Sequence, residues 1–142
     1  MNQIEKTMIL MAYGFWGYPF LEILFRGWSH WSMALAGSIC FGLMGLISDT
    51  LCRYRLPVRA IASMVAVLFV EFIFGCIFNL GMQLHVWDYS GELGNLAGQI
   101  CIKYSLVWFA LSIPLVWLAD RLPIDSAKKC KKSACKQREI GI

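Results

Sequence analysis

Four long segments that are almost free of charged residues dominate this 142-residue sequence. Between Arg59 and Asp88, for example, the only charged residue is Glu71. Each segment meets or approaches the roughly 20 apolar residues that a helix needs to cross the hydrocarbon layer of a membrane. The pattern predicts an all-α, polytopic membrane protein, with four transmembrane helices in a bundle. The predicted helices cover residues 8–25, 31–51, 58–82 and 99–119.

Composition separates this prediction from a soluble helical bundle. The chain is 58% hydrophobic and only 15% charged, which is too apolar for an ordinary soluble domain. Buried helices of a soluble bundle would carry a polar face at a period of 3.6 residues, whereas these carry only narrow polar stripes. The first helix is expected to be retained, because no small-residue signal-peptide cleavage site follows Phe25.

The distribution of basic residues predicts the orientation. Eleven of the 13 Lys and Arg residues fall on one side of the predicted helices, and only Arg26 and Lys103 lie toward the other. The positive-inside bias therefore places both termini in the cytoplasm of a multi-pass cell-membrane protein. Residues 1–123 form the transmembrane domain, and residues 124–142 form a basic, disordered cytoplasmic tail. We expect this tail to contact anionic membrane lipids and not nucleic acid.

Polar residues recur at spacings of three and four within the predicted helices, so each set shares one helical face. Most of these residues converge on the outer half of the bundle. The candidates from these stripes are Glu22, Arg26, Glu71, Asn79, Gln83, Asn95, Gln99 and Lys103. The small-residue stripe of the second helix, Ala34, Ser38, Gly42, Gly45 and Asp49, instead predicts a packing surface.

Glu71 is the most informative of these residues. It lies about 13 residues along the third predicted helix, roughly 20 Å at 1.5 Å per residue, which is near the membrane midplane. An unpaired carboxylate at that depth costs at least about 2–3 kcal/mol, so it should face the bundle interior and find a partner. We expect Glu22 to pair with Arg26, and Lys103 or Arg26 to reach Glu71. A neutral Glu71 that only ties helices together is the alternative.

The connection 85–99 contains Gly91, Gly94 and Gly98 together with an Asp-Tyr-Ser turn. This composition predicts irregular backbone, which is tolerated at membrane depth only where protein or a wet cavity satisfies it. A plain surface loop with glycine turns is the other interpretation.

Two stretches resemble a known family. GWSHWSMALAGSICFGLMGLISD (27–49) and VEFIFGCIFNLGMQLHVWDYSGELGNLAGQICIKYSLVW (70–108) are similar to segments of the integral membrane family described as putative ABC-transporter type IV (CmpB-like), which also has a eukaryotic branch. The resemblance covers about residues 13–117, and its most specific parts are Trp-Asp-Tyr-Ser and Asn-Leu-Ala-Gly-Gln-Ile. It implies a permease-like membrane protein. The positions it carries over are Glu71, Asn79, Trp87, Asp88, Tyr89, Asn95, Gly98 and Gln99.

Three functions stay open from the sequence. The first is a transporter, permease-like or channel component with an outward-facing pocket for a small polar or zwitterionic solute. It would act as a homo-oligomer or with a partner membrane subunit. A separate nucleotide-binding subunit would energise it, because the chain has no phosphate-binding loop. The second is a membrane binding or assembly protein, and the third is a lipid-modifying enzyme. No motif predicts a cofactor, metal or catalytic residue, so we expect no enzyme activity.

Overall fold

The computed structural model describes residues 2–122, all of them in helices or connecting segments apart from one isolated β-bridge between Leu96 and Ile100. The predicted basic tail, residues 124–142, lies outside the described residues. The elements are α1 (Gln3–Arg26), α2 (Trp31–Thr50), α3 (Leu56–Phe74), the π-helix η1 (Gly75–Gly81), which continues α3, and α4 (Ile102–Arg121). The prediction of four long helices is confirmed.

All four helices are long and apolar enough to span a membrane, with α3 and η1 counted as one span from Leu56 to Gly81. Two ends differ from the prediction by three residues or more. The first helix begins earlier, because Asn2 and Glu5 form a reciprocal capping box at its start. The last begins at Ile102 instead of residue 99, because the backbone of Gln99 bonds within the preceding loop.

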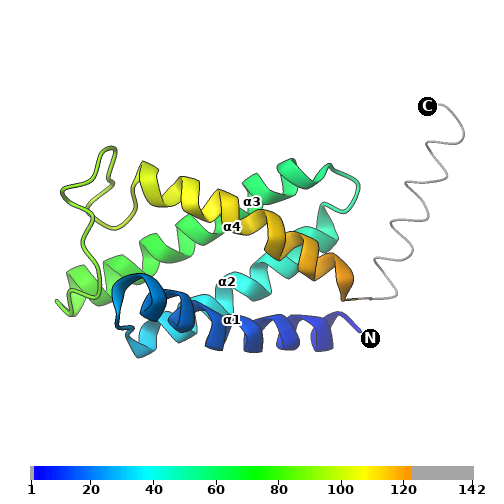
Figure 1. Ribbon diagram of the computed structural model, residues 1–142, viewed down its shortest axis with the longest axis horizontal. Helices are drawn as coiled ribbons and strands as arrows, with labels where there is room; N and C mark the ends of the chain where they lie inside the picture. Colours follow the sequence, from blue (N-terminus) through cyan, green and yellow to red (C-terminus); the bar gives the residue numbers. More distant parts are fainter. Residues whose placement is uncertain (1, 123–142) are drawn as a thin grey trace, which may run out of the picture.

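Each helix runs antiparallel to the one before it in the chain (Figure 1). One end of the bundle holds the start of α1, the connection 51–55 and the end of α4, and we call it the basal end. The other, called the loop end, holds the connection 27–30 and the segment 82–101. Short connections between antiparallel helices account for this arrangement.

Helix α2 is the central helix of the bundle, packing against α1, α3 and α4. Its contact with α1 is made by glycines: a Cβ atom on Gly14 would collide with the backbone of Gly37, and one on Gly37 with Tyr18. Small residues let membrane helices approach in this way. The predicted packing role of α2 is confirmed, since Ala34, Gly42 and Gly45 are all buried.

The exterior of the bundle is more apolar than the surface of a soluble protein. Large apolar side chains such as Trp16 and Phe20 are exposed, by 75% and 61%. Within residues 2–122, the buried polar side chains are Lys6, Ser32, Ser48, Arg59, Ser63, Glu71, Asn79, Gln99 and Ser112. An apolar exterior with polar groups buried inside suits a lipid environment, where polar groups must find partners inside the bundle.

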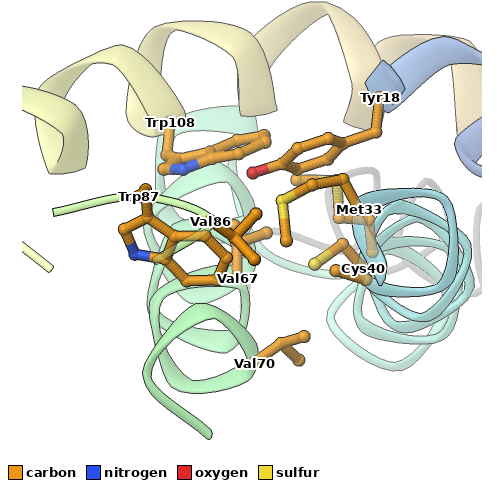
Figure 2. Packing of buried hydrophobic residues seen from close by; sticks show 10 residues of the cluster. Tyr18, Met33, Cys40, Val67, Val70, Val86, Trp87 and Trp108 are labelled. Atoms are coloured by element: carbon orange, nitrogen blue, oxygen red, sulfur yellow. The ribbon is translucent and has the colours of Figure 1, made fainter. Parts of the chain in front are cut away.

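The main apolar core lies between the polar groups of the two ends. Figure 2 shows Tyr18 of α1 and Trp108 of α4 facing each other, with Met33, Val67 and Val86 packed close by. Helices α1 and α4 are not among the closely packed helix pairs, so these two aromatic side chains bridge the wider gap between them. Their ring centroids are 5.3 Å apart.

Candidate functional site

Glu71 faces the interior of the bundle, as predicted, with only 5% of the residue exposed. One carboxylate oxygen, Oε1, accepts hydrogen bonds from the Tyr18 hydroxyl at 2.9 Å and from Trp108 Nε1 at 2.8 Å. The expected ion pair with Lys103 or Arg26 is wrong. Lys103 bonds to Glu92 on the surface, and Arg26 bonds to Glu22. These partners were not predicted, because the prediction considered only charged partners and both donors are neutral aromatic side chains.

The second carboxylate oxygen of Glu71, Oε2, is buried and has no hydrogen-bond partner among the described residues. Three other buried side-chain atoms within residues 2–122 share this property: Arg59 Nε, Ser63 Oγ and Ser112 Oγ. None of those three residues lines the cavity described next. Because a buried carboxylate oxygen without a partner is costly, Oε2 is the most polar unsatisfied acceptor of the described bundle.

An open cavity of about 260 Å³ lies between α1, α4 and the segment 82–101. Its polar lining comes from Glu22, Arg26 and Glu71, together with the four aromatic residues Tyr18, Tyr89, Tyr104 and Trp108. Apolar side chains complete the lining: Leu21, Phe25, Val107 and Leu111. We call these eleven residues the Glu71 pocket. A few polar groups in a mostly apolar concavity are typical of a small-molecule site.

Glu22 and Arg26 form the predicted pair, with Arg26 Nη1 donating to Glu22 Oε1 at 3.1 Å. Each is also held by a second contact. Arg26 Nη2 donates to the Val86 carbonyl at 2.8 Å, and the Ser29 hydroxyl donates to Glu22 Oε2 at 2.7 Å. The charge of Arg26 is therefore balanced within the pocket lining, whereas that of Glu71 is not.

A second polar network attaches the segment 82–101 to η1. The Asn79 amide donates to the Trp87 carbonyl and to Gln99 Oε1, both at 2.9 Å, and accepts from the Val86 backbone N–H at 2.7 Å. Trp87 Nε1 in turn donates to the Gln99 carbonyl at 2.9 Å. Val86, Trp87 and Gln99 are buried. The irregular backbone predicted for this connection thus has its polar groups satisfied by protein.

The π-helix η1 and Gly75 make room for this network. A Cβ atom on Gly75 would collide with the side chain of Gln99, so only glycine permits the observed approach. The wider turn of η1 ends at Gly81, and Gln83 then adopts a left-handed backbone with φ of 55°. Short π-helices of this kind are frequent at functional sites. No residue pattern in the sequence analysis predicted η1.

Seven of the predicted site residues therefore gather around two adjacent features. Glu22, Arg26, Glu71 and Tyr89 line the pocket, and Asn79, Trp87 and Gln99 form the network beside it. The remaining four, Gln83, Asp88, Asn95 and Lys103, are exposed and lie outside the pocket lining. For Gln83 the reason is η1, which ends the helical stripe before that residue.

The other three exposed residues have local contacts in the loop. Asn95 donates to the carbonyls of Ser90 and Glu92, and Lys103 pairs with Glu92 at 2.9 Å. Asp88 accepts from the Ser90 hydroxyl and backbone N–H, and these bonds lower the pKa of the Asp88 carboxyl. Gly98, also carried over from the family, has φ of +66° and leaves no space for a side chain beside Ser90.

Aromatic residues of the pocket were largely missed as site residues. Tyr18, Tyr104 and Trp108 were not among the predicted site residues. Tyr104 and Trp108 lie four residues apart in α4, which places them on one helical face. Burial raises the pKa of the Tyr89 hydroxyl far above its ordinary value, with the nearby Glu71 carboxylate adding to the effect. Tyr89 and Tyr104 stack at 4.5 Å between ring centroids.

A second polar group, at the basal end, was not predicted from the sequence. Lys6 Nζ bonds to Asp49 Oδ1 at 2.7 Å, and Arg59 Nη2 bonds to Asp120 Oδ2 at 2.7 Å. Ser48 joins the second pair, accepting from Arg59 and donating to Asp120. We call these five residues the basal cluster. Its residues stand at the ends of consecutive antiparallel helices, a placement that could have indicated their proximity.

Residues 7–137 match the model of a protein family described as Putative ABC-transporter type IV. Comparisons with curated proteins and with solved structures gave no match. The family match covers α1 from residue 7, the whole of α2, α3, η1 and α4, and both of the polar features at the loop end.

Proposed function

Since the chain belongs to the Putative ABC-transporter type IV family, we propose that it is a permease-like component of a membrane transporter. The Glu71 pocket is its solute-binding site. The observation that carries the proposal is Glu71 itself, a buried carboxylate in the membrane-spanning region. It lines the cavity, and one of its oxygens has no hydrogen-bond partner within residues 2–122. Ionisable residues within membrane spans typically mark binding sites and solute pathways.

The orientation proposed from the basic residues places the loop end, and with it the pocket, toward the outside of the cell membrane. A solute would enter beside the Glu22–Arg26 pair and reach Glu71 past Tyr18 and Trp108. Both of these aromatic residues bond to Glu71, so solute contact with the carboxylate would be transmitted to α1 and α4.

Four helices provide few walls for a pathway of their own, so we propose that the protein works as a homo-oligomer or with a partner membrane subunit. A separate nucleotide-binding subunit would supply energy. The face available for such assembly is the exposed side of α1, where a shallow hollow of about 880 Å³ is lined by Tyr13 and apolar residues such as Trp16 and Phe20.

The test is solute flux in proteoliposomes containing the purified full chain. Small polar solutes of each charge type are assayed for entry, with wild type compared with Glu71→Gln. Glu92→Gln, which alters a carboxylate outside the pocket, is the matched control. We expect flux that Glu71→Gln reduces and Glu92→Gln preserves. If neither substitution changes the flux, Glu71 is not part of the solute pathway. If no solute enters, the result contradicts a permease that works without other subunits.

A further inference from the structure

The lining of the Glu71 pocket specifies the charge of its ligand. Its formal charges are the two carboxylates of Glu22 and Glu71 and the one guanidinium of Arg26, a net charge of −1 when all three are ionised. Glu22 and Arg26 neutralise each other. Glu71 has only uncharged donors, both of them on Oε1. When the three groups are ionised, the uncompensated charge of the pocket is therefore negative and lies at Glu71.

Arg26 is already engaged by groups of this chain. One terminal nitrogen donates to Glu22, the other donates to the Val86 carbonyl, and the guanidinium lies 4.8 Å from the centre of the Trp28 ring. The two hydrogen bonds use two of the five guanidinium N–H donors. A carboxylate or phosphate ligand at the remaining donors would lie beside the carboxylates of Glu22 and Glu71, which disfavours an anion.

The walls of the pocket favour a particular kind of cation. Four aromatic rings line it, contributed by α1, α4 and the segment 82–101. The faces of aromatic rings attract cations within about 6 Å, and rings grouped around an acidic residue are well suited to alkylated ammonium groups. Trp108 and Tyr18 also fix the carboxylate of Glu71 in place, so its free oxygen is already oriented before a ligand arrives.

Size restricts the choice further. The cavity of about 260 Å³ is slightly smaller than the sites of about 300–1,000 Å³ that hold drug-sized ligands. Leu21, Phe25, Val107 and Leu111 supply apolar surface for methyl or methylene groups. A hydrated metal ion would find few oxygen ligands there, because the pocket contains two carboxylates and one of them is already paired.

From these observations we infer that the Glu71 pocket binds a small alkylammonium cation, with the ammonium group against Glu71 Oε2 and the alkyl groups against the aromatic walls. The inference rests on the proposed function for its biological meaning but not for its test, since binding is measured without transport. Protonated amines and quaternary ammonium ions share this chemistry, and the choice of probes separates them.

The experiment measures binding of defined probes to the purified full chain in detergent by calorimetry and by the shift of its unfolding midpoint. The probes are choline, tetramethylammonium and methylammonium. The uncharged control is 3,3-dimethylbutan-1-ol, which replaces the nitrogen of choline by carbon, and acetate is the anionic control. We expect at least one ammonium probe to bind and raise the midpoint, while the alcohol and acetate do not. Preference for choline or for methylammonium distinguishes quaternary from protonated ligands.

Variants link the binding to the pocket. Glu71→Gln keeps an acceptor for Tyr18 and Trp108 but removes the charge, so affinity should fall roughly tenfold or more, the value of one charged contact. Glu92→Gln should leave it unchanged. Tyr89→Leu removes a wall and should weaken binding, whereas Tyr89→Phe retains the ring and should not. The Tyr89 pair keeps the test decisive if Glu71→Gln does not fold.

Equal binding of choline and its uncharged analogue would overturn the inference, as would unchanged affinity in Glu71→Gln or in Tyr89→Leu. Binding of no ammonium probe would overturn it too. These outcomes are distinct from those of the flux assay. Ammonium binding without flux would retain the ligand class and contradict a permease that works without other subunits. Flux of other solutes without ammonium binding would retain the permease and contradict the ligand class.

Discussion

The basal cluster and the Glu71 pocket both bury carboxylates in an apolar bundle, but they satisfy them differently. At the basal end, Asp49 pairs with Lys6 and Asp120 pairs with Arg59, so each acid has a cationic partner on another helix. In the pocket, Glu71 has two neutral donors and one oxygen without a hydrogen-bond partner among residues 2–122. Each acid of the basal cluster therefore has a cation to balance it, whereas Glu71 has none among the described residues.

The two regions differ in what the loss of a charged side chain would cost. The Lys6–Asp49 pair joins α1 to α2, and the Arg59–Asp120 pair joins α3 to α4. Breaking such a pair by removing one partner leaves an uncompensated charge, which costs more than the pair itself contributes. The same does not apply to Glu71, whose charge has no cationic partner among the described residues to lose.

The largest expected effect is at the basal cluster. Arg59→Met removes the cation that bonds to both oxygens of Asp120, and we expect the free energy of unfolding to fall by about 3–5 kcal/mol. Equilibrium unfolding in detergent or bicelles measures the change. Arg53→Met, at an exposed position in the neighbouring connection, is the control and should have little effect. If both variants unfold alike, the basal cluster is not the stabilising element.

The next largest effect is expected at the network that holds the loop. Asn79→Leu leaves the Val86 N–H, the Trp87 carbonyl and Gln99 Oε1 without this partner. Because each buried polar group without a partner costs roughly 1–3 kcal/mol, we expect a loss of at least about 2 kcal/mol. Proteolysis and hydrogen exchange should report opening of the segment 82–101 first. Exchange that increases uniformly over all four helices would contradict this local role.

A smaller effect is expected at Glu71. Glu71→Gln retains an oxygen that can accept from Tyr18 and Trp108 and removes a charge without a cationic partner. Replacing an uncompensated buried charge by a neutral group should cost less than about 1 kcal/mol. The unfolding assay used for Arg59→Met gives the comparison directly. A loss as large as that of Arg59→Met would mean that Glu71 serves the same structural role as the basal cluster.

The same two regions show which features of the fold and the site could be predicted from the sequence alone. Helix number and approximate limits followed from apolar length, which depends only on composition along the chain. Burial of Glu71 followed from the cost of a charge in lipid. Its partners did not, because the analysis sought cations, and a tyrosine hydroxyl and an indole N–H are equally capable donors.

Asn79 and Gln83 show where residue spacing alone does not predict burial. Their spacing is helical, yet Asn79 is buried in the network while Gln83 is exposed. The difference comes from η1, a local change of helical geometry that a fixed spacing of three or four residues does not represent. The basal cluster was missed for a related reason. Its five residues come from four different helices, and only the antiparallel packing brings them together.

The smallest expected effect lies outside both regions, at Asp88, and it tests whether the loop contributes charge to the pocket. The Ser90 hydroxyl and backbone N–H hold the pKa of Asp88 below its ordinary value. Since the folded-state pKa is the lower one, the ionised form contributes stability that is fully present above the ordinary aspartate pKa of about 3.9. This contribution is lost as the pH falls through the folded-state value.

Asp88→Asn should therefore lower the unfolding midpoint slightly at pH 7, and the difference from wild type should shrink in acid. Ammonium binding at pH 7 should be unchanged, because Asp88 does not line the pocket. A weakened affinity in Asp88→Asn would extend the pocket's negative field to the loop, so that Glu71 would no longer be its sole source.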